Sequence, residues 1–250
     1  MINLDKIEED YNLIFTTENK EIIKKHGKEQ SVERNLDFVI NELQLEIPII
    51  SRCPNILCRD YEMIKENYDY LKQRNIGPYD KETILHMLTI KPEELKSIIE
   101  QCERYQIPIT PIILKRTSKE IAENIKICQD NNIPLTEEIF QKHPKDLENT
   151  ISYVRNTYGE DYVLSPVVAC EKKHIEKVFS YLNGKKSLDL VITNPNILRL
   201  TLAEIIERET LLHEISESFV MNNRFNPIFD LSRNSFKEKK NQIIESRIEK

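Results

Sequence analysis

The feature that most constrains this chain is an internal repeat between residues 94 and 144. The pattern of residues 95–102, followed by an Ile-Pro-Ile-Thr turn at 107–110, returns 26 residues later at 121–128 and in the Ile-Pro-Leu-Thr turn at 133–136. Self-similarity at a period of about 20 to 50 residues is typical of stacked units, none of which buries its apolar face alone. The chain is therefore expected to fold as a repeat array.

Each unit of the array begins with a helix marked by three apolar residues at positions i, i+4 and i+7. That spacing places the three side chains on one face of a helix. The six triplets are Leu36-Ile40-Leu43, Ile64-Tyr68-Leu71, Leu95-Ile99-Cys102, Ile121-Ile125-Cys128, Leu147-Ile151-Val154 and Ile175-Phe179-Leu182, with a further helix starting at Ile205. The period varies between 26 and 31 residues, which indicates insertions in the loops.

A shorter second helix follows each first helix, and its start carries capping signals. Thr110-Pro111 and Ser165-Pro166 place a hydroxyl before a proline, and Asp80 precedes another such helix. Hydroxyl and carboxylate side chains cap helix N-termini, and proline is tolerated in the first turn. Residues 201–204 match a capping box that opens the last long helix.

The two ends of the chain differ from the repeats. Residues 3–30 predict two short leader helices, the second ending at Gly27. The repeat is lost beyond about Asn222, and residues 235–250 predict a charged helix or tail whose Ile243, Ile244 and Ile248 cover the open end of the array.

The predicted fold is therefore an all-α, right-handed α-solenoid of about six irregular two-helix repeats with terminal capping helices. Its parts are N-terminal capping helices in 1–30, the repeat array in 31–220, and a C-terminal loop with a charged tail or capping helix in 221–250.

Composition limits the possible settings of this chain. Five cysteines without a secretory signal favour a reduced, cytoplasmic protein. The acidic N-terminus does not resemble an organelle transit peptide, and no apolar run approaches the roughly 18 residues that would span a bilayer. The formal net charge of −6 gives no general support for nucleic-acid binding.

Two turns carry a resemblance to a known family. Residues 53–57 read Cys-Pro-Asn-Ile-Leu and residues 194–198 read Asn-Pro-Asn-Ile-Leu. Within a helical repeat of this length, they resemble the mitochondrial transcription termination factor (mTERF) repeat. The resemblance implies a curved α-solenoid, and it implies nucleic-acid binding along a basic groove, as in several members of that family.

Basic residues recur around the turns and form the best candidate binding site. They are Arg52, Lys91, Lys115, Arg116, Lys142, His143, Lys172 and Lys173. Equivalent positions in a solenoid line one edge, so these cations could form a ladder that meets a phosphate backbone. The alternative interpretation is that they lie near helix C-termini, where they complement the helix dipole and add solubility.

The sequence offers no nucleophile motif, phosphate-binding glycine loop or paired carboxylates, and its histidines lack the pairing of a zinc site. We therefore expect no enzyme, no cofactor and no metal. The expected function is a non-catalytic binding scaffold that engages a protein partner, as an adaptor or inhibitor, through an extended surface. The alternative is an RNA- or DNA-binding regulator of the mTERF type. No membrane partner is expected, and the sequence leaves the oligomeric state open.

Overall fold

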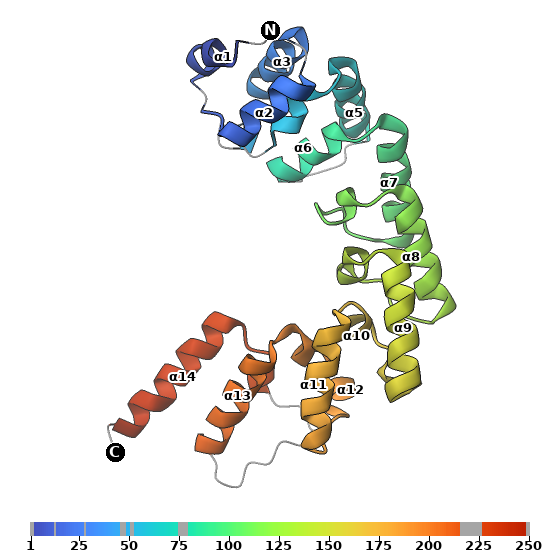
Figure 1. The fold of residues 1–250 in the computed structure, drawn as a ribbon, viewed down its shortest axis with the longest axis vertical. Helices are drawn as coiled ribbons and strands as arrows, with labels where there is room; N and C mark the ends of the chain where they lie inside the picture. Colours follow the sequence, from blue (N-terminus) through green and yellow to red (C-terminus); the bar gives the residue numbers. More distant parts are fainter. Residues whose placement is uncertain are drawn as a thin grey trace. The chain divides into compact units, whose positions relative to one another are not determined.

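The computed structural model describes residues 3–12, 14–27, 29–45, 49–50, 53–74, 80–215 and 227–248, and within these ranges it contains helices, turns and loops but no strand (Figure 1). The predicted all-α class is confirmed. The chain forms two compact units, Met1–Ala122 and Glu123–Lys250, and the boundary falls inside helix α8. None of the described helices combines the length and the apolar character needed to cross a membrane.

Unit 1 holds the N-terminal helices and the first long helices. In chain order its elements are α1 (Leu4–Tyr11), α2 (Thr17–His26), α3 (Glu29–Asp37), the π-helical turn η1 (Phe38–Glu42), the short 3₁₀ helix η2 (Pro54–Cys58), α5 (Tyr61–Gln73), α6 (Lys81–Thr89), α7 (Pro92–Tyr105), the 3₁₀ turn η3 (Ile113–Lys115) and the start of α8 (Ser118–Asp130).

Unit 2 continues the same alternation of long and short elements. After α8 come η4 (Glu137–Gln141), α9 (Pro144–Tyr158), η5 (Glu160–Tyr162), α10 (Ser165–Val168), α11 (Lys172–Gly184), α12 (Leu190–Thr193), η6 (Pro195–Arg199), α13 (Leu202–Ile215), η7 (Pro227–Phe229) and α14 (Arg233–Ile248).

Local capping explains where the long helices begin. The Asp60 side chain accepts a hydrogen bond of 2.8 Å from the amide of Glu62 at the start of α5. Thr201 and Glu204 form the predicted capping box, with each side chain accepting from the other's amide, at 2.8 Å to Glu204 and 3.3 Å to Thr201. Helices α7 and α9 instead begin with Pro92 and Pro144. Proline lacks a backbone N–H, but an N–H in the first turn would have no partner within the helix.

The apolar triplets form the core in most of the long helices. All three members are buried in the four triplets that start at Leu95, Ile121, Leu147 and Ile175. The triplet of α5 is buried at both ends, while Tyr68 in its middle is half-buried and packs edge-on against Phe38, with ring centroids 5.3 Å apart.

The first triplet was predicted in the wrong place. Ile40 and Leu43 are only half-buried, whereas Val32, Leu36 and Val39 are fully buried. Helix α3 begins at Glu29. Its buried i, i+4, i+7 triplet is Val32-Leu36-Val39, which starts four residues before the predicted triplet. The π-helical turn that follows moves residues 40 and 43 off this face.

Within each unit the long and the short elements form separate rows (Figure 1). In unit 1, α5 packs against both α3 and α7, and η2 packs against α6. In unit 2, α10 packs against η4 and η6. Arg199 at the end of η6 reaches past α10 to Glu138 in η4, with 2.8 Å between the nitrogen and oxygen. A side chain of η6 therefore reaches η4, on the other side of α10.

The chain ends depart in part from the prediction. The leader segment contains α1 and α2, and α2 ends just before Gly27 as expected. The C-terminal helix starts at Arg233, and Phe236 is its buried anchor. Ile243 is half-buried and Ile244 is 42% exposed, so the cover of the array's open end by these residues stays a prediction. The side chain of Ile248 and the region around Asn222 lie outside the described residues.

Candidate binding surface

The predicted basic row is exposed at most of its described positions. Lys91 and His143 directly precede α7 and α9, and both are exposed. Lys172 and Lys173 are exposed in the first turn of α11, and Lys115 is exposed at the end of η3. Arg52 lies outside the described residues.

Lys142 does not belong to an exposed row. Its side chain is buried, and its ammonium donates a hydrogen bond of 2.8 Å to the Thr150 hydroxyl. Burial lowers the pKa of Lys142, and this effect outweighs the opposing influence of Glu171. The side-chain amide of Asn124 also binds the Lys142 carbonyl at 3.0 Å, which holds this residue inward. Lys142 is therefore not available as an exposed member of the predicted basic row.

Two further cations of the row lie close to carboxylates. Arg116 lies 4.0 Å from Glu120, and Lys172 lies 3.8 Å from Glu176. The Lys172 ammonium also lies 4.2 Å from the ring centroid of Tyr153, within the range of a cation–π interaction. These contacts reduce the positive charge that the row offers to a polyanion.

The helix-dipole interpretation applies to only part of the row. Lys115 is the last residue of η3 and Lys142 directly follows η4, where a cation complements the dipole. Lys91, Lys172 and Lys173 lie instead at the N-terminal ends of long helices. A cation there opposes the dipole. Complementing a helix dipole therefore does not explain these three lysines.

Buried asparagines at equivalent positions connect each long helix to the next short element. The Asn35 amide donates to the carbonyl of Arg59 at 2.8 Å, and the Asn67 amide donates to the carbonyl of Ile90 at 2.7 Å. Each amide also lies within bonding distance of two further carbonyls of the same short element. Asn124 makes the equivalent bond to Lys142. The sequence analysis missed these residues, although a polar residue three positions after a core residue was a usable signal.

Arg208 and Thr150 occupy the same position in later helices. Arg208 is 1% exposed, and its guanidinium donates to the carbonyl of Ile228 in η7. Its Cζ atom lies 4.7 Å from the ring centroid of Phe236 in α14. Thr150 accepts the bond from Lys142. Arg208 therefore meets the same backbone requirement as the asparagines, whereas Thr150 bonds to the Lys142 side chain and to the Asp146 carbonyl of its own helix.

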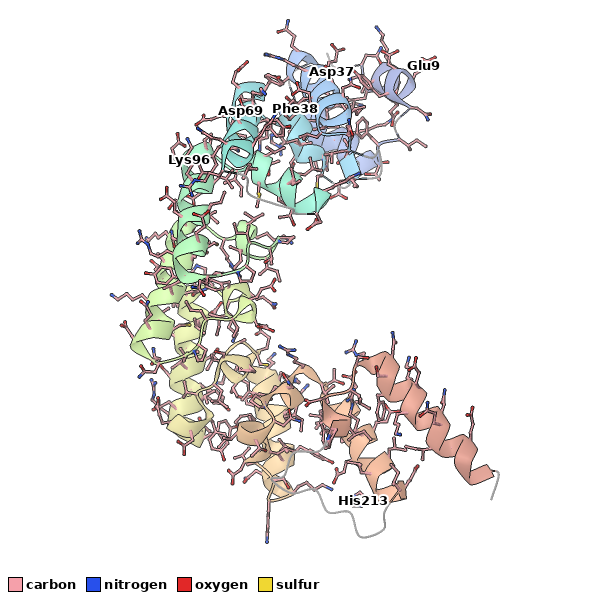
Figure 2. All side chains as sticks on the ribbon, turned by 180° about the vertical axis from the view of Figure 1, so that it is seen from behind. Glu9, Asp37, Phe38, Asp69, Lys96 and His213 are labelled. Carbon is pink, nitrogen blue, oxygen red and sulfur yellow. The ribbon has the colours of Figure 1, made fainter. Side chains whose placement is uncertain are left out.

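Ion pairs join neighbouring long helices on the outer surface. Unit 1 has Arg34–Glu62 at 3.1 Å, Lys96–Glu66 at 2.8 Å and Arg74–Glu103 at 2.7 Å, and Lys96 is labelled on α7 in Figure 2. Unit 2 has Lys240–Glu207 at 2.6 Å, and an Arg233–Glu204 pair that holds the pKa of Glu204 down at about 2. Exposed pairs contribute little stability, so these contacts accompany the helix packing and do not hold it.

A polar cluster surrounds the buried carboxylate of Glu209 between α11 and α13. It accepts a hydrogen bond from the Tyr181 hydroxyl, and it lies 3.0 Å from Lys185 and 3.6 Å from His213, which is labelled near the end of α13 in Figure 2. Burial raises the pKa of Glu209, but the bonds from Tyr181 and Lys185 outweigh it and the pKa is lowered. Glu209 is thus an ionised, fully engaged group that locks two helices together.

Cys170 and His174 are held within the fold. Burial raises the pKa of the Cys170 thiol to about 11, so this thiol is protonated near neutral pH and is a poor nucleophile. A ring nitrogen of His174 lies 2.9 Å from the Leu198 carbonyl, within the fold. In the part of the chain that the structure describes, His, Cys, Asp and Glu side chains form no group of three that could hold a metal ion.

Comparisons with protein-family models, with curated proteins and with solved structures found no match to this chain.

Proposed function

We propose that this protein is a non-catalytic binding scaffold, an α-solenoid that engages a protein partner through the extended surface of its helical units. The observation that carries the proposal is the charge pattern of that surface, where cations and carboxylates alternate and Lys142 in the predicted basic row is withdrawn into the core.

The solenoid architecture is supported by equivalent contacts at equivalent positions. A buried polar side chain three residues after the first core residue of a long helix binds the next short element in α3, α5, α8 and α13. The last of these, Arg208, binds η7, and α14 follows η7 as a long helix follows each earlier short element. We therefore extend the array of about six units to include α13, η7 and α14, with α14 as its cap.

A protein partner accounts for the surface better than a nucleic acid does. A nucleic-acid groove needs several unopposed cations in a row, because binding strength grows with the number of phosphates neutralised. Here Arg116 and Lys172 have carboxylates within 4.0 Å, and Lys142 is buried. Protein partners accept surfaces of mixed sign, since complementary charges can be arranged pair by pair.

The alternative is an RNA- or DNA-binding regulator related to the mTERF repeat family. It is supported by the exposed Lys91, Lys115 and Lys173 and by the two proline-asparagine turns. Both candidates require the same solenoid, so binding experiments decide between them.

The first experiment is fluorescence-anisotropy titration with labelled random single-stranded RNA, single-stranded DNA and duplex DNA at low and high salt. The proposal predicts no salt-sensitive binding at micromolar protein. Binding in that range that weakens steeply with salt would reassign the function to nucleic-acid recognition. Affinity purification from cells that express the chain, followed by reconstitution from purified components, should then give a stoichiometric protein complex.

A further inference from the structure

The last turn of α11 contains the single Asn-Gly dipeptide of the chain, Asn183-Gly184. In such a dipeptide the backbone nitrogen of the glycine can attack the side-chain carbonyl carbon of the asparagine, because glycine has no side chain to hinder the approach. The attack requires an asparagine side chain that is exposed and unengaged, and a backbone that can leave the helical conformation. Both conditions are met at the end of α11.

The first condition concerns the two side-chain positions. Asn183 is exposed, and within the described residues its side-chain amide has no hydrogen-bond partner. Gly184 is exposed too, and a Cβ atom added to it would meet no described atom within 4 Å outside the backbone of its own helix. Its φ is not positive, so neither conformation nor close packing calls for glycine at this position. Glycine here only weakens the helix relative to alanine.

The second condition concerns the hydrogen bonds that close the last turn, which are irregular. The Lys185 amide is shared between the carbonyls of Tyr181 at 3.2 Å and Leu182 at 3.1 Å. Lys186 has a left-handed conformation with a φ of 56°, which is unfavourable for a residue with a side chain. Terminal turns of helices open locally more readily than helix interiors do. Asn183 can therefore leave the helical conformation while the rest of α11 stays folded.

We propose that Asn183 is a site of spontaneous deamidation. The Gly184 nitrogen forms a bond to the Cγ atom of Asn183, the bond between Cγ and Nδ2 breaks, and the side-chain nitrogen leaves as ammonia with the proton of the Gly184 amide. Solvent water then opens the cyclic imide at either of its two carbonyl groups, which gives aspartate or a β-linked isoaspartate. The net reaction is the hydrolysis of an amide by water, and it is independent of the proposed scaffold function.

The modification affects the junction between α11 and α13. The isoaspartate form adds one methylene group to the main chain shortly before Lys185, whose ammonium lies 3.0 Å from the buried Glu209 carboxylate of α13. The new carboxylate also lies at the C-terminal end of α11, where the helix dipole disfavours a negative charge. Both products therefore loosen the last turn, and the isoaspartate form displaces Lys185 from Glu209.

The test is incubation of the full chain at mildly alkaline pH and physiological temperature for several weeks, followed by peptide mass mapping and isoaspartyl methyltransferase labelling. Asn156 is the internal control, because it is exposed in the last turn of α9 and is followed by the β-branched Thr157. Deamidation should be faster at Asn183 than at Asn156 by about tenfold or more. Gly184→Ala, for which the structure has room, should slow the reaction at Asn183 by a similar factor.

The consequence is measured on the deamidated chain, which ion-exchange chromatography separates by its additional negative charge. Hydrogen exchange in residues 181–187 and in α13 should be faster in this chain than in the unmodified chain. The variant Asn183→Asp should reproduce only the part of the change that is due to charge, because its main chain is not lengthened.

Three results would overturn the site: equal rates at Asn183 and Asn156, an unaltered rate in Gly184→Ala, or deamidation of Asn183 only in a chain unfolded by urea. The last of these would show that the α11 backbone protects the dipeptide. Unchanged hydrogen exchange in α13 of the deamidated chain would overturn the effect on the pair of Lys185 and Glu209.

Discussion

Asn67 in unit 1 and Arg208 in unit 2 perform the same task with different chemistry. Each is buried at the same position of its long helix, and each binds backbone carbonyl groups of the short element that follows. Asn67 uses a neutral amide that lies within bonding distance of three carbonyls. Arg208 brings a charged group into the core, where it binds one carbonyl and packs on Phe236.

The comparison shows that the repeated feature is a backbone requirement and not a side-chain identity. A buried carbonyl without a partner is costly, which explains a donor at this position in α3, α5, α8 and α13, whereas α7 and α11 carry the buried Ile98 and Val178 there. An amide meets it at Asn124 and a guanidinium at Arg208, while Thr150 at this position accepts a bond from the buried Lys142 ammonium instead. A charged donor costs more folding free energy to bury than a neutral one, because the charge loses its hydration. The following substitutions test this difference.

The largest effect is expected from Arg208→Ala. It removes the bond to Ile228 and the contact with Phe236, and it leaves a cavity, at a cost of about 3 kcal/mol. Urea unfolding should show the loss of stability, and hydrogen exchange should accelerate in α14. Arg199→Ala is the control, since the Arg199 side chain is 65% exposed. Unchanged protection of α14 would show that Arg208 does not hold this helix.

Asn67→Ala is expected to cost about 2 kcal/mol, because it leaves buried carbonyls of α6 without their donor. Hydrogen exchange should rise locally in residues 81–90 and not in unit 2. The exposed Asn156 offers a matched control as Asn156→Ala. An effect as small as that of the control would mean that solvent satisfies these carbonyls.

Lys142→Met tests the charged donor. The substitution removes a buried charge, and Thr150 keeps its bond to the Asp146 carbonyl, so the variant should be more stable by about 1 kcal/mol at neutral pH. Burial lowers the pKa of Lys142 in the folded chain below its ordinary value of 10.5. At pH values between the lowered pKa and 10.5, the unfolded chain therefore binds more protons than the folded chain. The difference in unfolding free energy between the variant and the unmodified chain should therefore shrink as the pH rises towards 10.5.

Thermal unfolding of both proteins at several alkaline pH values measures this gain, with Lys145→Met as the exposed control. A stability difference that does not change with pH would place the Lys142 ammonium in water.

The smallest effect is expected from Lys240→Ala, which breaks the Lys240–Glu207 pair between α13 and α14. The Lys240 side chain is 37% exposed, and solvent screening limits the loss to about 0.5 kcal/mol or less. Chemical denaturation at low and high salt should show that this small loss disappears with added salt, and Lys237→Ala should show none. A loss comparable to that of Arg208→Ala would mean that surface pairs, and not the buried donors, attach α14.

Local sequence signals predicted the long helices well. The i, i+4, i+7 triplets of α7, α8, α9 and α11 are buried as expected, and the capping box at Thr201 is present. These features depend on residues within a few turns of one helix, which is why the sequence shows them directly. The first triplet failed because neither the start of α3 nor the π-helical turn after it has a clear local signal.

The basic row was predicted less well for a different reason. Sequence spacing places Lys142 beside His143 at a turn, and both could have been exposed. Lys142 is buried because Thr150 and Asn124, from different helices, bind its ammonium and its carbonyl. No pattern within the turn itself records those contacts.

The sequence by itself determined the all-helical class, most of the helix faces that form the core and the helix starts at Asp80 and Thr201, whereas the predicted caps Thr110 and Ser165 do not cap a helix. Only the tertiary structure decided which polar side chains enter the core and which lysines remain free. The physical reason is that burial of Asn67, Lys142 or Arg208 depends on partner groups in other segments, 8 to 23 residues away in sequence.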